Sequence, residues 1–598
     1  MQTADWPDSF PRADTVLVVP PFAPTFQPSI ACHLLQACAR QRGHDVIVVY
    51  ANLLFAEIVG HRTYDQMLER RLYLEHIFKN AAFGTSSSAS TNNQPLLMDG
   101  VRGVGPWLRR LGEIVRSIAP RVVGATCSFE AITSSVALLN RCKEIDPNIT
   151  TIIGGANCEG EMAEGILSLR ARIDHVFSGE SESSFPAFLE RLWCAGGVAD
   201  RVIEGSPYTT LDDLPLPVYH EYFDQFTLHM GDDQTPSPYR AVPYESSRGC
   251  WWGQKHHCTF CGLNGMSIGF RQKTAERVAA DLQTLLNDYP VSRVNFVDNI
   301  MPNHYYSTLL PRLAEALPPS TSLFYEQKSN ISFKKACLLK AAHVTYIQPG
   351  IESLNTHILQ CMDKGVRADQ NLALLRYARS LRIRLAWNLL AGFPGDRVDD
   401  YAQMADLLPH VVHLEPPASV EFVRFDRFSP YFDHPDRFGI SNLRPKEVYF
   451  DIFPSWTRYD QLAYYFDGDY TCGAFECPSV IERIQEETRV WRERWALSPK
   501  PVLAIVHVVR DQYAVVDTRA RDASATFDVV DSEVAEVLLH GARLEDRAQL
   551  SWAIERRLLV ELDGRLVPLA TASPEILMQF ERDSDPVTVR SKAVRLSD

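Results

Sequence analysis

The stretch Ser246-Ser-Arg-Gly-Cys-Trp-Trp-Gly-Gln-Lys-His-His-Cys-Thr-Phe-Cys-Gly-Leu-Asn264 holds three cysteines in the spacing C-x7-C-x2-C. They are Cys250, Cys258 and Cys261. The run from Val242 to Ser247 just before them alternates apolar and polar residues, which predicts a strand. The first cysteine then lies on a loop past a strand end, where the functional groups of barrel folds gather.

Three cysteines in such a loop are compatible with more than one metal site. Their thiolates could hold three irons of a cubic [4Fe–4S] cluster and leave the fourth iron open to chelate the amino and carboxylate groups of S-adenosylmethionine. Zinc is the alternative, and it usually takes four ligands in a closed site, often as two C-x2-C pairs. The chain has no second C-x2-C, although His256 and His257 could donate. The cysteines alone leave a cluster, zinc and a plain buried thiol group open.

The residues around the cysteines favour the cluster. Phe260 precedes the last cysteine, and the pattern C-W-W-G-x-K-x-H-C-x-F-C-G-L-N resembles the cluster loop of radical S-adenosylmethionine (SAM) enzymes. The likeness is greatest to the cobalamin-dependent radical SAM enzymes that mature ribosomally synthesised peptides. The usual spacing in that superfamily is C-x3-C-x2-C, so this loop is four residues longer. The resemblance implies three cofactors, namely a [4Fe–4S] cluster on these cysteines, SAM and cobalamin. It also implies a precursor peptide as substrate and an electron donor such as a flavodoxin or ferredoxin.

Composition sets wider limits. At 598 residues and 45% hydrophobic content, the chain is expected to form several globular domains. The net charge of −14 argues against a general nucleic-acid binder. No apolar run approaches the ~20 residues that cross a bilayer, and the first residues do not read as a signal peptide. Thirteen scattered cysteines are typical of a reducing compartment. We therefore expect a cytoplasmic protein with neither nucleic-acid nor membrane partners.

The first third of the chain alternates strands with helices. Short β-branched runs end near residues 20, 50, 126, 154 and 179, which predicts a doubly wound, Rossmann-like α/β sheet over residues 14–205. Such sheets bind ligands beyond the carboxyl ends of their strands. The small or polar residues at those ends are the candidate cofactor contacts: Thr126, Cys127, Ser128, Phe129, Gly154, Gly155, Ala156, Asn157, Gly179 and Glu180.

Three segments of this sheet resemble the cobalamin-binding domain that precedes such radical domains. They are Pro20-Pro-Phe-Ala23, Gly154-Gly-Ala-Asn-Cys-Glu159 and Ser178-Gly-Glu180. The D-x-H-x-x-G signature is absent from the first βα loop, so the resemblance implies cobalamin with its lower base displaced and no histidine of this motif under the cobalt. A nucleotide is the alternative ligand, although G-x-G-x-x-G and P-loop motifs are missing. Gly154-Gly155 could also be only a tight turn.

A proline-punctuated linker, residues 206–241, leads to a second series of strands and helices over 242–470. Six β/α units are expected, forming a partial barrel with polar groups at the strand ends. By resemblance, Glu326 and Glu352 would bind the ribose hydroxyls or amino group of SAM, Asn388 its methionyl or adenosyl part, and the Phe260 backbone its adenine. Each charged strand end could instead be a solvated cap. Two further strand-end residues complete the candidate set: Lys328 and Gln348.

The barrel is followed by a smaller module. Arg427 and Tyr431, near the end of the barrel, are the candidate catalytic residues, with a structural salt-bridge network as the alternative. Residues 471–580 combine helices with a hairpin around Asp563-Gly564, which suggests a small α+β, winged-helix-like module. Such modules bind leader peptides by strand addition, and dimerisation or packing is the alternative. The polar segment 581–598 is expected to be disordered.

The resemblance implies a radical SAM methyltransferase that moves a methyl group from SAM, through methylcobalamin, to a carbon of a ribosomally made peptide. Two alternatives remain. The same cofactors could form thioethers or rings on the peptide without methyl transfer. The chain could also be a non-catalytic cobalamin- or peptide-binding protein whose cysteines hold zinc. If both cofactor domains act on one substrate, the carboxyl edge of the N-terminal sheet must face the barrel mouth.

Overall fold

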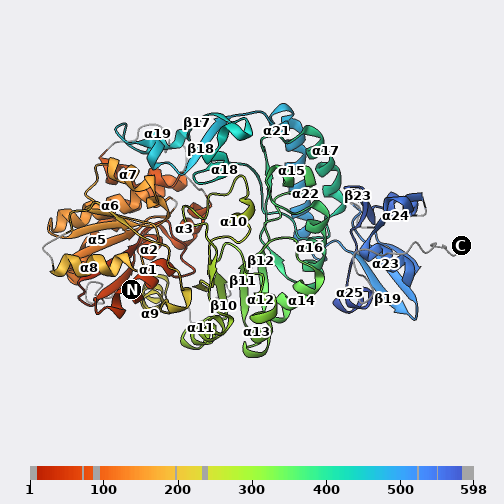
Figure 1. The fold of residues 1–598 in the computed structure, drawn as a ribbon, viewed down its shortest axis with the longest axis horizontal. Coiled ribbons are helices and arrows are strands. Elements are labelled where there is room, and N and C mark those ends of the chain that lie inside the picture. The colour runs from red at the N-terminus through yellow and green to blue at the C-terminus, as the bar shows by residue number, and fades with distance from the viewer. Residues whose placement is uncertain are drawn as a thin grey trace.

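The computed structural model describes residues 10–69, 73–84, 95–128, 130–194, 198–231, 240–520, 524–548 and 550–581. Three parts follow one another along the long axis: an N-terminal α/β domain, a central barrel and a small C-terminal module (Figure 1). The candidate contact Phe129 and the predicted disordered tail beyond residue 581 lie outside the described residues. Within those ranges, no helix combines the length and apolarity needed to cross a membrane.

The N-terminal domain is built on six parallel strands in the order β2-β1-β3-β4-β5-β6. The order reverses between β1 and β3, which creates the switch point where ligands of such sheets bind. The five buried β-branched runs predicted from the sequence form β1 (Thr15–Val19), β2 (Val46–Tyr50), β3 (Val122–Thr126), β4 (Thr150–Gly154) and β5 (His175–Ser178). The sixth strand, β6 (Val202–Glu204), was not predicted.

Helices cover both faces of this sheet. One apolar cluster joins Leu17 and Val19 to α1 (Ile30–Gln41) and α8 (Ser184–Cys194). Val16 and Val18 point to the other face, into the cluster that includes α2 (Ala51–Val59), α6 (Ile132–Ile145) and α7 (Glu161–Ser168). The doubly wound arrangement predicted from the sequence is thereby confirmed.

An insertion after α2 stabilises one edge of the domain. It contributes α3 (His61–Leu68), α4 (Glu75–Phe83) and α5 (Pro95–Ile118). The buried carboxylate of Glu75 accepts hydrogen bonds from the backbone N–H groups of Ile132 and Thr133, at 2.9 and 2.7 Å. These groups open α6 and have no partner within that helix, so a residue of the insertion caps a helix of the sheet domain.

The central domain is the partial barrel. Five parallel strands stand in the order β13-β12-β11-β10-β7, and β14 pairs with β15 beside them. The strand next to β12 is split, because its backbone follows β12 only to Ala386 and then pairs with Glu352 and Ser419. The strands are β7 (Val242–Tyr244), β10 (Arg293–Phe296), β11 (Ser322–Glu326), β12 (Val344–Gln348), β13 (Arg384–Leu385), β14 (Leu389–Ala391) and β15 (Val420–Phe422).

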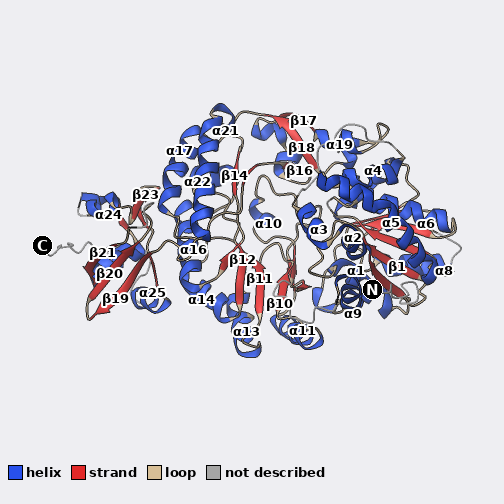
Figure 2. Cartoon of the chain, turned by 180° about the vertical axis from the view of Figure 1, so that it is seen from behind, coloured by secondary structure: helices blue, strands red, loops and turns tan. Residues whose placement is uncertain are grey.

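Helices lie on the outside of these strands, as the view from behind shows (Figure 2). They are α11 (Ala275–Asp288), α13 (Leu310–Ala316), α14 (Phe333–Ala341), α16 (Ala368–Leu381) and α17 (Val398–Leu407). The next long helix, α22 (Pro478–Ala496), packs on α17 and brings Trp491 to 5.9 Å from Trp387, ring centre to ring centre. In space α22 therefore belongs with the barrel, although the sequence placed the domain boundary before it.

A small antiparallel sheet joins the first two domains. It has the order β16-β18-β17, with β16 (Phe425–Asp426), β17 (Ser441–Pro445) and β18 (Tyr465–Asp469). The adjoining helix α20 (Tyr459–Leu462) packs on α7. A Cβ at Gly165 would lie 2.5 Å from the backbone of Leu462, so only glycine permits this approach.

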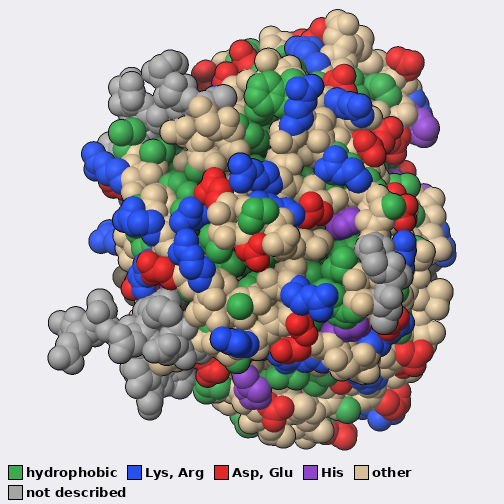
Figure 3. Space-filling view, turned by 90° about the vertical axis from the view of Figure 1, so that its left-hand side faces the viewer, with side chains coloured by type: hydrophobic (Ala, Val, Ile, Leu, Met, Phe, Trp, Pro, Cys, Tyr) green, Lys and Arg blue, Asp and Glu red, His purple; other side chains and the backbone are tan. Residues whose placement is uncertain are grey.

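At the N-terminal end of the molecule, acidic and basic side chains are interspersed (Figure 3).

The C-terminal module has two sheets, with the orders β21-β20-β19-β25 and β22-β24-β23. Asp563 and Gly564 both have positive φ, 50° and 72°, and form the predicted hairpin turn. The buried guanidinium of Arg376 on α16 donates to Ala570 O and Leu539 O, which fixes the module on the barrel. Its elements are β19 (Leu503–Val509), β20 (Gln512–Asp517), β21 (Thr526–Asp531), α23 (Ser532–His540), β22 (Ala542–Arg543), α24 (Ser551–Glu555), β23 (Leu559–Leu562), β24 (Arg565–Pro568), β25 (Thr571–Ala572) and α25 (Pro574–Glu581).

Candidate functional site

The cysteine loop leaves the barrel at the carboxyl end of β7. Its base is closed by the antiparallel pair β8 (Ser247–Arg248) and β9 (Arg271–Gln272). Between the first two cysteines the chain makes one helical turn, α10 (Gly253–His256), with Gln254 N–H bonded to Cys250 O at 2.9 Å. The residues that exceed the usual superfamily spacing are therefore taken up by a local turn, and the loop still returns its cysteines to one cavity.

That cavity lies at the barrel mouth and measures about 150 Å³. It brings together all three cysteines and every predicted barrel contact except Asn388, whose amide oxygen accepts from Ser419 Oγ at 3.0 Å. The predicted residues on its wall are Cys250, Cys258, Phe260, Cys261, Glu326, Lys328, Gln348 and Glu352. Trp252, Leu263, Asn264, Asn299, Ile300, Gln327, Gly350 and Lys364 complete the lining.

Lys364 is the charged residue of this cavity that the sequence did not reveal. Its amine donates to Glu352 Oε1 at 3.1 Å, and its side chain is 14% exposed. Burial alone would lower the pKa of this lysine, but the charge of Glu352 and the nearby Cys258 outweigh burial and raise it. Lys364 therefore stays charged beside the cysteines. It lies in the turn after α15 (Thr356–Cys361), away from every strand end, so no motif marked it.

The cavity also perturbs its acidic groups and thiols. Burial raises the pKa of Glu326 to about 7 and that of Cys261 to about 12. Lys328 lies over the ring of Trp252, and burial lowers its pKa to about 8. A cavity with three thiols, two lysines and two carboxylates suits a metal cluster with a zwitterionic, hydroxylated ligand beside it. Such perturbed groups in one cleft are typical of functional sites.

Asp298 holds the start of the cysteine loop in place. It follows β10 and accepts from Ser246 N at 2.7 Å and Ser247 Oγ at 2.8 Å. It is 1% exposed, and burial raises its pKa to about 7. The strand end that leads to Cys250 is thereby tied to its neighbouring strand.

The zinc alternative requires several ligands around one point. Among the residues that the structure describes, no group of three or more His, Cys, Asp or Glu side chains, the three cysteines included, is arranged to hold a metal ion, so this finding does not separate zinc from a cluster. His257 Nε2 bonds to the backbone oxygen of Cys261 at 2.7 Å, and the ring of His256 stacks on Trp252.

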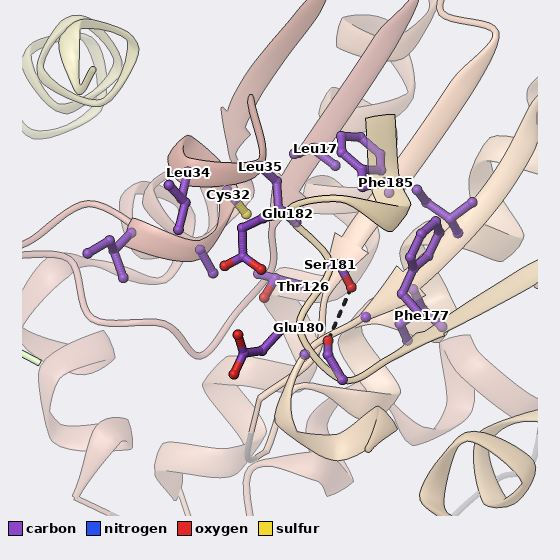
Figure 4. Close-up of a pocket in the computed structure, with 18 of the residues that line it drawn as sticks. Leu17, Cys32, Leu34, Leu35, Thr126, Phe177, Glu180, Ser181, Glu182 and Phe185 are labelled. Carbon is purple, nitrogen blue, oxygen red and sulfur yellow. Dashed lines mark hydrogen bonds between the residues drawn. The ribbon is translucent and has the colours of Figure 1, made fainter. Parts of the chain in front are cut away.

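A second cavity, of about 280 Å³, lies at the carboxyl edge of the N-terminal sheet (Figure 4). Its walls are mostly apolar, with Leu34 and Leu35 of α1 facing Phe177 and Phe185. The predicted contacts on its wall are Thr126, Gly154, Gly155, Gly179 and Glu180. The helix α1 and residues Cys32 and Glu182 were not predicted as contacts, because only the folded domain brings them to this edge.

The remaining predicted contacts of this domain lie elsewhere. Cys127 is fully buried and Asn157 Nδ2 lies 3.7 Å from its sulfur, while Ala156 and Ser128 are absent from the cavity wall. Gly155 has φ of +120°, and a Cβ there would lie 2.6 Å from Cys127 O. The Gly-Gly pair is thus more than a tight turn, since a crossing of two backbones requires it.

Ion pairs connect the two cavities. Arg248, two residues before Cys250, pairs with Glu180 at 2.7 Å, Glu182 at 2.6 Å and Glu245 at 2.8 Å. Arg271 pairs with Glu180 at 2.6 Å. Glu180 and Glu182 follow β5, so the carboxyl edge of the N-terminal sheet faces the cysteine loop.

The two candidate catalytic residues lie outside both cavities. Arg427 is 2% exposed, donates to Ala463 O at 2.8 Å and pairs with Glu161 of α7 at 3.3 Å. Tyr431 is fully buried, and its hydroxyl donates to Cys361 O at 3.4 Å. These buried contacts are typical of the alternative given above, a structural network. They give no support to the predicted catalytic role of Arg427 and Tyr431.

Comparison with known proteins agrees with this geometry. Residues 244–408 match the family model of the radical SAM superfamily, so this part of the chain is a radical SAM domain. An uncharacterized methyltransferase of Pyrococcus horikoshii is 22% identical over 338 residues, which cover 54% of this chain and 69% of that protein. The hopanoid C-3 methylase of Methylococcus capsulatus is 25% identical over 313 residues, which cover 49% of this chain and 58% of that protein.

Two solved structures share the fold. The cobalamin-dependent SAM radical enzyme OxsB with aqua-cobalamin bound matches with a TM-score of 0.52 at 11% identity, over 82% of this chain and 74% of that one. The radical SAM methyltransferase TsrM of Kitasatospora setae, with cobalamin and a [4Fe–4S] cluster bound, matches with a TM-score of 0.53 at 12% identity, over 79% of this chain and 91% of that one. At these identities the likeness shows the fold, which confirms the predicted N-terminal sheet and barrel.

Proposed function

We propose that the chain is a cobalamin-dependent radical SAM methyltransferase that places a methyl group on a carbon atom. The observation that carries the proposal is the pair of cavities on either side of Arg248, one holding three cysteines and the other at the ligand-binding edge of an α/β sheet. The two curated relatives are named as methyltransferases, and the two similar structures hold cobalamin.

The residues of the barrel cavity have distinct parts in this proposal. Cys250, Cys258 and Cys261 would hold the [4Fe–4S] cluster. Glu326 and Glu352 would accept hydrogen bonds from SAM, and Lys364 would fix the direction of the Glu352 carboxylate. When bound, the cluster and SAM supply a carbon radical that can take hydrogen from an unactivated carbon, and the corrinoid supplies the methyl group. The protein positions these partners and excludes water from between them.

The test uses chain purified without oxygen, reconstituted with iron, sulfide and hydroxocobalamin, and supplied with a reductant and SAM. We expect both 5′-deoxyadenosine and S-adenosylhomocysteine, since one SAM molecule is cleaved reductively and another donates its methyl group. Formation of 5′-deoxyadenosine alone would favour the non-methylating alternative with the same cofactors. Neither product, with zinc in place of iron, would favour the non-catalytic binding protein.

We propose further that the substrate is a ribosomally made precursor peptide, modified in the cytoplasm with electrons from a flavodoxin or ferredoxin. The exposed edge strand of the C-terminal module supports the proposal of a peptide substrate. Its strand β21 pairs with β20 and forms the end of its sheet, and Phe527 and Val529 on it are 68% and 65% exposed. An apolar edge strand of this kind is a template for an added strand.

The peptide proposal is tested by selecting a displayed library of random peptides on the full chain. We expect enrichment of sequences with alternating apolar residues, lost in Val529→Lys. Met578→Lys is the matched control, because Met578 is also exposed (44%) but lies on α25 away from the edge. Selection that is equal in both variants would contradict strand addition at β21.

A further inference from the structure

The cavity of the N-terminal domain is too small for a whole corrinoid. At about 280 Å³ it lies at the lower limit of small-ligand pockets, which span roughly 300–1,000 Å³. Its walls come from α1, from the ends of β3 and β4, and from the segment after β5. Apolar side chains line most of it, so the cavity suits one flat, largely apolar arm of a larger ligand.

The polar groups at this cavity are almost all engaged by one another. Glu180 receives two hydrogen bonds from Arg271 and one from Tyr208 N–H. Burial would raise the pKa of Glu180, but these bonds and the charge of Arg248 outweigh burial and lower it. Both oxygens of Glu245 accept from Arg248, at 2.8 and 2.9 Å.

Glu182 is the exception. Its Oε1 accepts from Arg248 at 2.6 Å, whereas its Oε2 is buried and has no hydrogen-bond partner among the residues that the structure describes. The side chain is only 8% exposed and lies on the cavity wall, which Thr126 and Cys32 also line (Figure 4). A buried oxygen of this kind is costly unless a donor satisfies it. Among the described residues on its wall, the mostly apolar cavity therefore offers one buried carboxylate oxygen that still lacks a donor.

The charge balance strengthens this preference for a donor. Three carboxylates, Glu180, Glu182 and Glu245, share two guanidinium groups, Arg248 and Arg271. The network thus carries surplus negative charge on the cavity side. A ligand group that offers only acceptors would be repelled, whereas an N–H or O–H group would complete the network.

We propose that Glu182 determines which ligand arm this cavity binds, by accepting a hydrogen bond from a hydroxyl or amide donor on the nucleotide arm of the corrinoid. The proposal rests on the proposed function, since it assumes that the ligand is a corrinoid. The apolar walls hold the flat base of the arm, and the Glu182 carboxylate accepts the hydrogen bond from the donor on the arm. Glu182 thus acts in binding and specificity, with no part in the chemical step.

The test compares two corrinoids and several variants in equilibrium binding to the apoprotein, followed by absorbance. Hydroxocobalamin carries the nucleotide arm, and cobinamide lacks it. In Glu182→Gln, the amide can satisfy either Arg248 or the ligand donor, but not both. We expect hydroxocobalamin to bind at least about tenfold more weakly to Glu182→Gln. Cobinamide affinity should stay within about twofold of wild type.

Two further variants distinguish loss of the contact between Glu182 and the nucleotide arm from a general loss of corrinoid binding. Glu190→Gln removes a carboxylate of α8 that is about half exposed and pairs with Arg42 on the surface, so both affinities should match wild type. Glu245→Gln disturbs Arg248 from the barrel side and should weaken both corrinoids alike. Thermal unfolding of each variant checks that it is folded.

The outcomes are distinct. Equal losses of both corrinoids in Glu182→Gln, or no loss of either, would overturn the role of Glu182 while leaving the proposed function intact. Failure of the wild-type chain to bind either corrinoid would overturn the proposed function and this inference together.

Discussion

The two cavities beside Arg248 differ in the chemistry of the side chains that line them. The barrel cavity is lined by thiols and by charges of both signs, among them the ion pair of Lys364 with Glu352 at 3.1 Å. The N-terminal cavity is lined mostly by apolar side chains, and one carboxylate oxygen on its wall, Oε2 of Glu182, is buried without a hydrogen-bond partner among the described residues. The walls of the first suit a charged ligand, and those of the second suit a mostly apolar ligand group that carries a hydrogen-bond donor.

This difference follows from where the walls come from. The barrel cavity gathers the carboxyl ends of neighbouring parallel strands, where polar groups collect in such folds. The N-terminal cavity lies between a sheet edge and the amphipathic helix α1, so its walls are the apolar surfaces that would otherwise pack together. If the two cavities hold separate cofactors, a substitution in one cavity should remove its cofactor and leave the other cofactor bound.

Replacing Cys250, Cys258 and Cys261 together with alanine should have the largest effect. We expect bound iron to fall from about four atoms per chain to none, and 5′-deoxyadenosine formation to be abolished. Corrinoid binding should persist, because the second cavity contains none of these cysteines. Iron analysis and the absorbance spectrum of the same sample give both values. Loss of the corrinoid along with the iron would show that the two cofactors do not bind independently.

Gly155→Ala should produce the reverse pattern. An added Cβ would meet Cys127 O at 2.6 Å in a backbone conformation with φ of +120°, so the loop must move and the corrinoid should be lost while iron is retained. Gly43→Ala is the matched control, because Gly43 also has positive φ (+81°) but nothing lies within 4 Å of its added Cβ. Corrinoid bound as tightly to Gly155→Ala as to Gly43→Ala would contradict the assignment.

Lys364→Met should leave Glu352 without its cation. We expect a loss of about 2 kcal/mol in the free energy of unfolding and a SAM affinity at least tenfold weaker. Adding Glu352→Gln should recover part of the stability, since the unpaired charge is removed. Lys335→Met is the control, because that lysine is half-buried on α14 outside the cavity, where its amine donates to Asn303 at 2.9 Å and lies 4.6 Å from the centre of the Tyr306 ring. Urea unfolding and SAM titration measure both effects. A Lys364→Met chain that matched Lys335→Met in both would show that the pair is unimportant.

The smallest expected effect concerns pH. Because burial raises the pKa of Glu326 to about 7, this carboxylate is charged above that pH and protonated below it. If it accepts hydrogen bonds from SAM, SAM affinity should fall several-fold as the pH is lowered from 8 to 6. Glu326→Gln should bind SAM with a flatter pH profile. A wild-type profile that is already flat would remove Glu326 from the SAM site.

The sequence was most informative where the functional residues are contiguous or follow a strand. The cysteine loop is one uninterrupted motif, and Glu326, Gln348 and Glu352 lie at strand ends, so their meeting in one cavity could be predicted. Lys364 could not, because it lies in a helix-terminal turn, and only the folded barrel brings it to Glu352.

The N-terminal domain shows a second limit. The strand ends predicted its ligand-binding edge, but the direction of each loop decided which side chains reach the cavity. Cys127 turns into the core and Glu182 into the cavity, and both directions depend on the backbone crossing at Gly155 and on pairing with Arg248. Similarly, the charge of Arg427 was visible in the sequence, but its burial between α7 and the small sheet was not.

If the proposed function is right, one chain holds an iron–sulfur cluster and a corrinoid in adjacent cavities. Iron, sulfide and corrinoid can be measured in one sample of chain purified and reconstituted without oxygen. We expect about four irons and four sulfides per chain together with one tightly bound corrinoid. Zinc in place of iron, with no corrinoid retained after gel filtration, would contradict it.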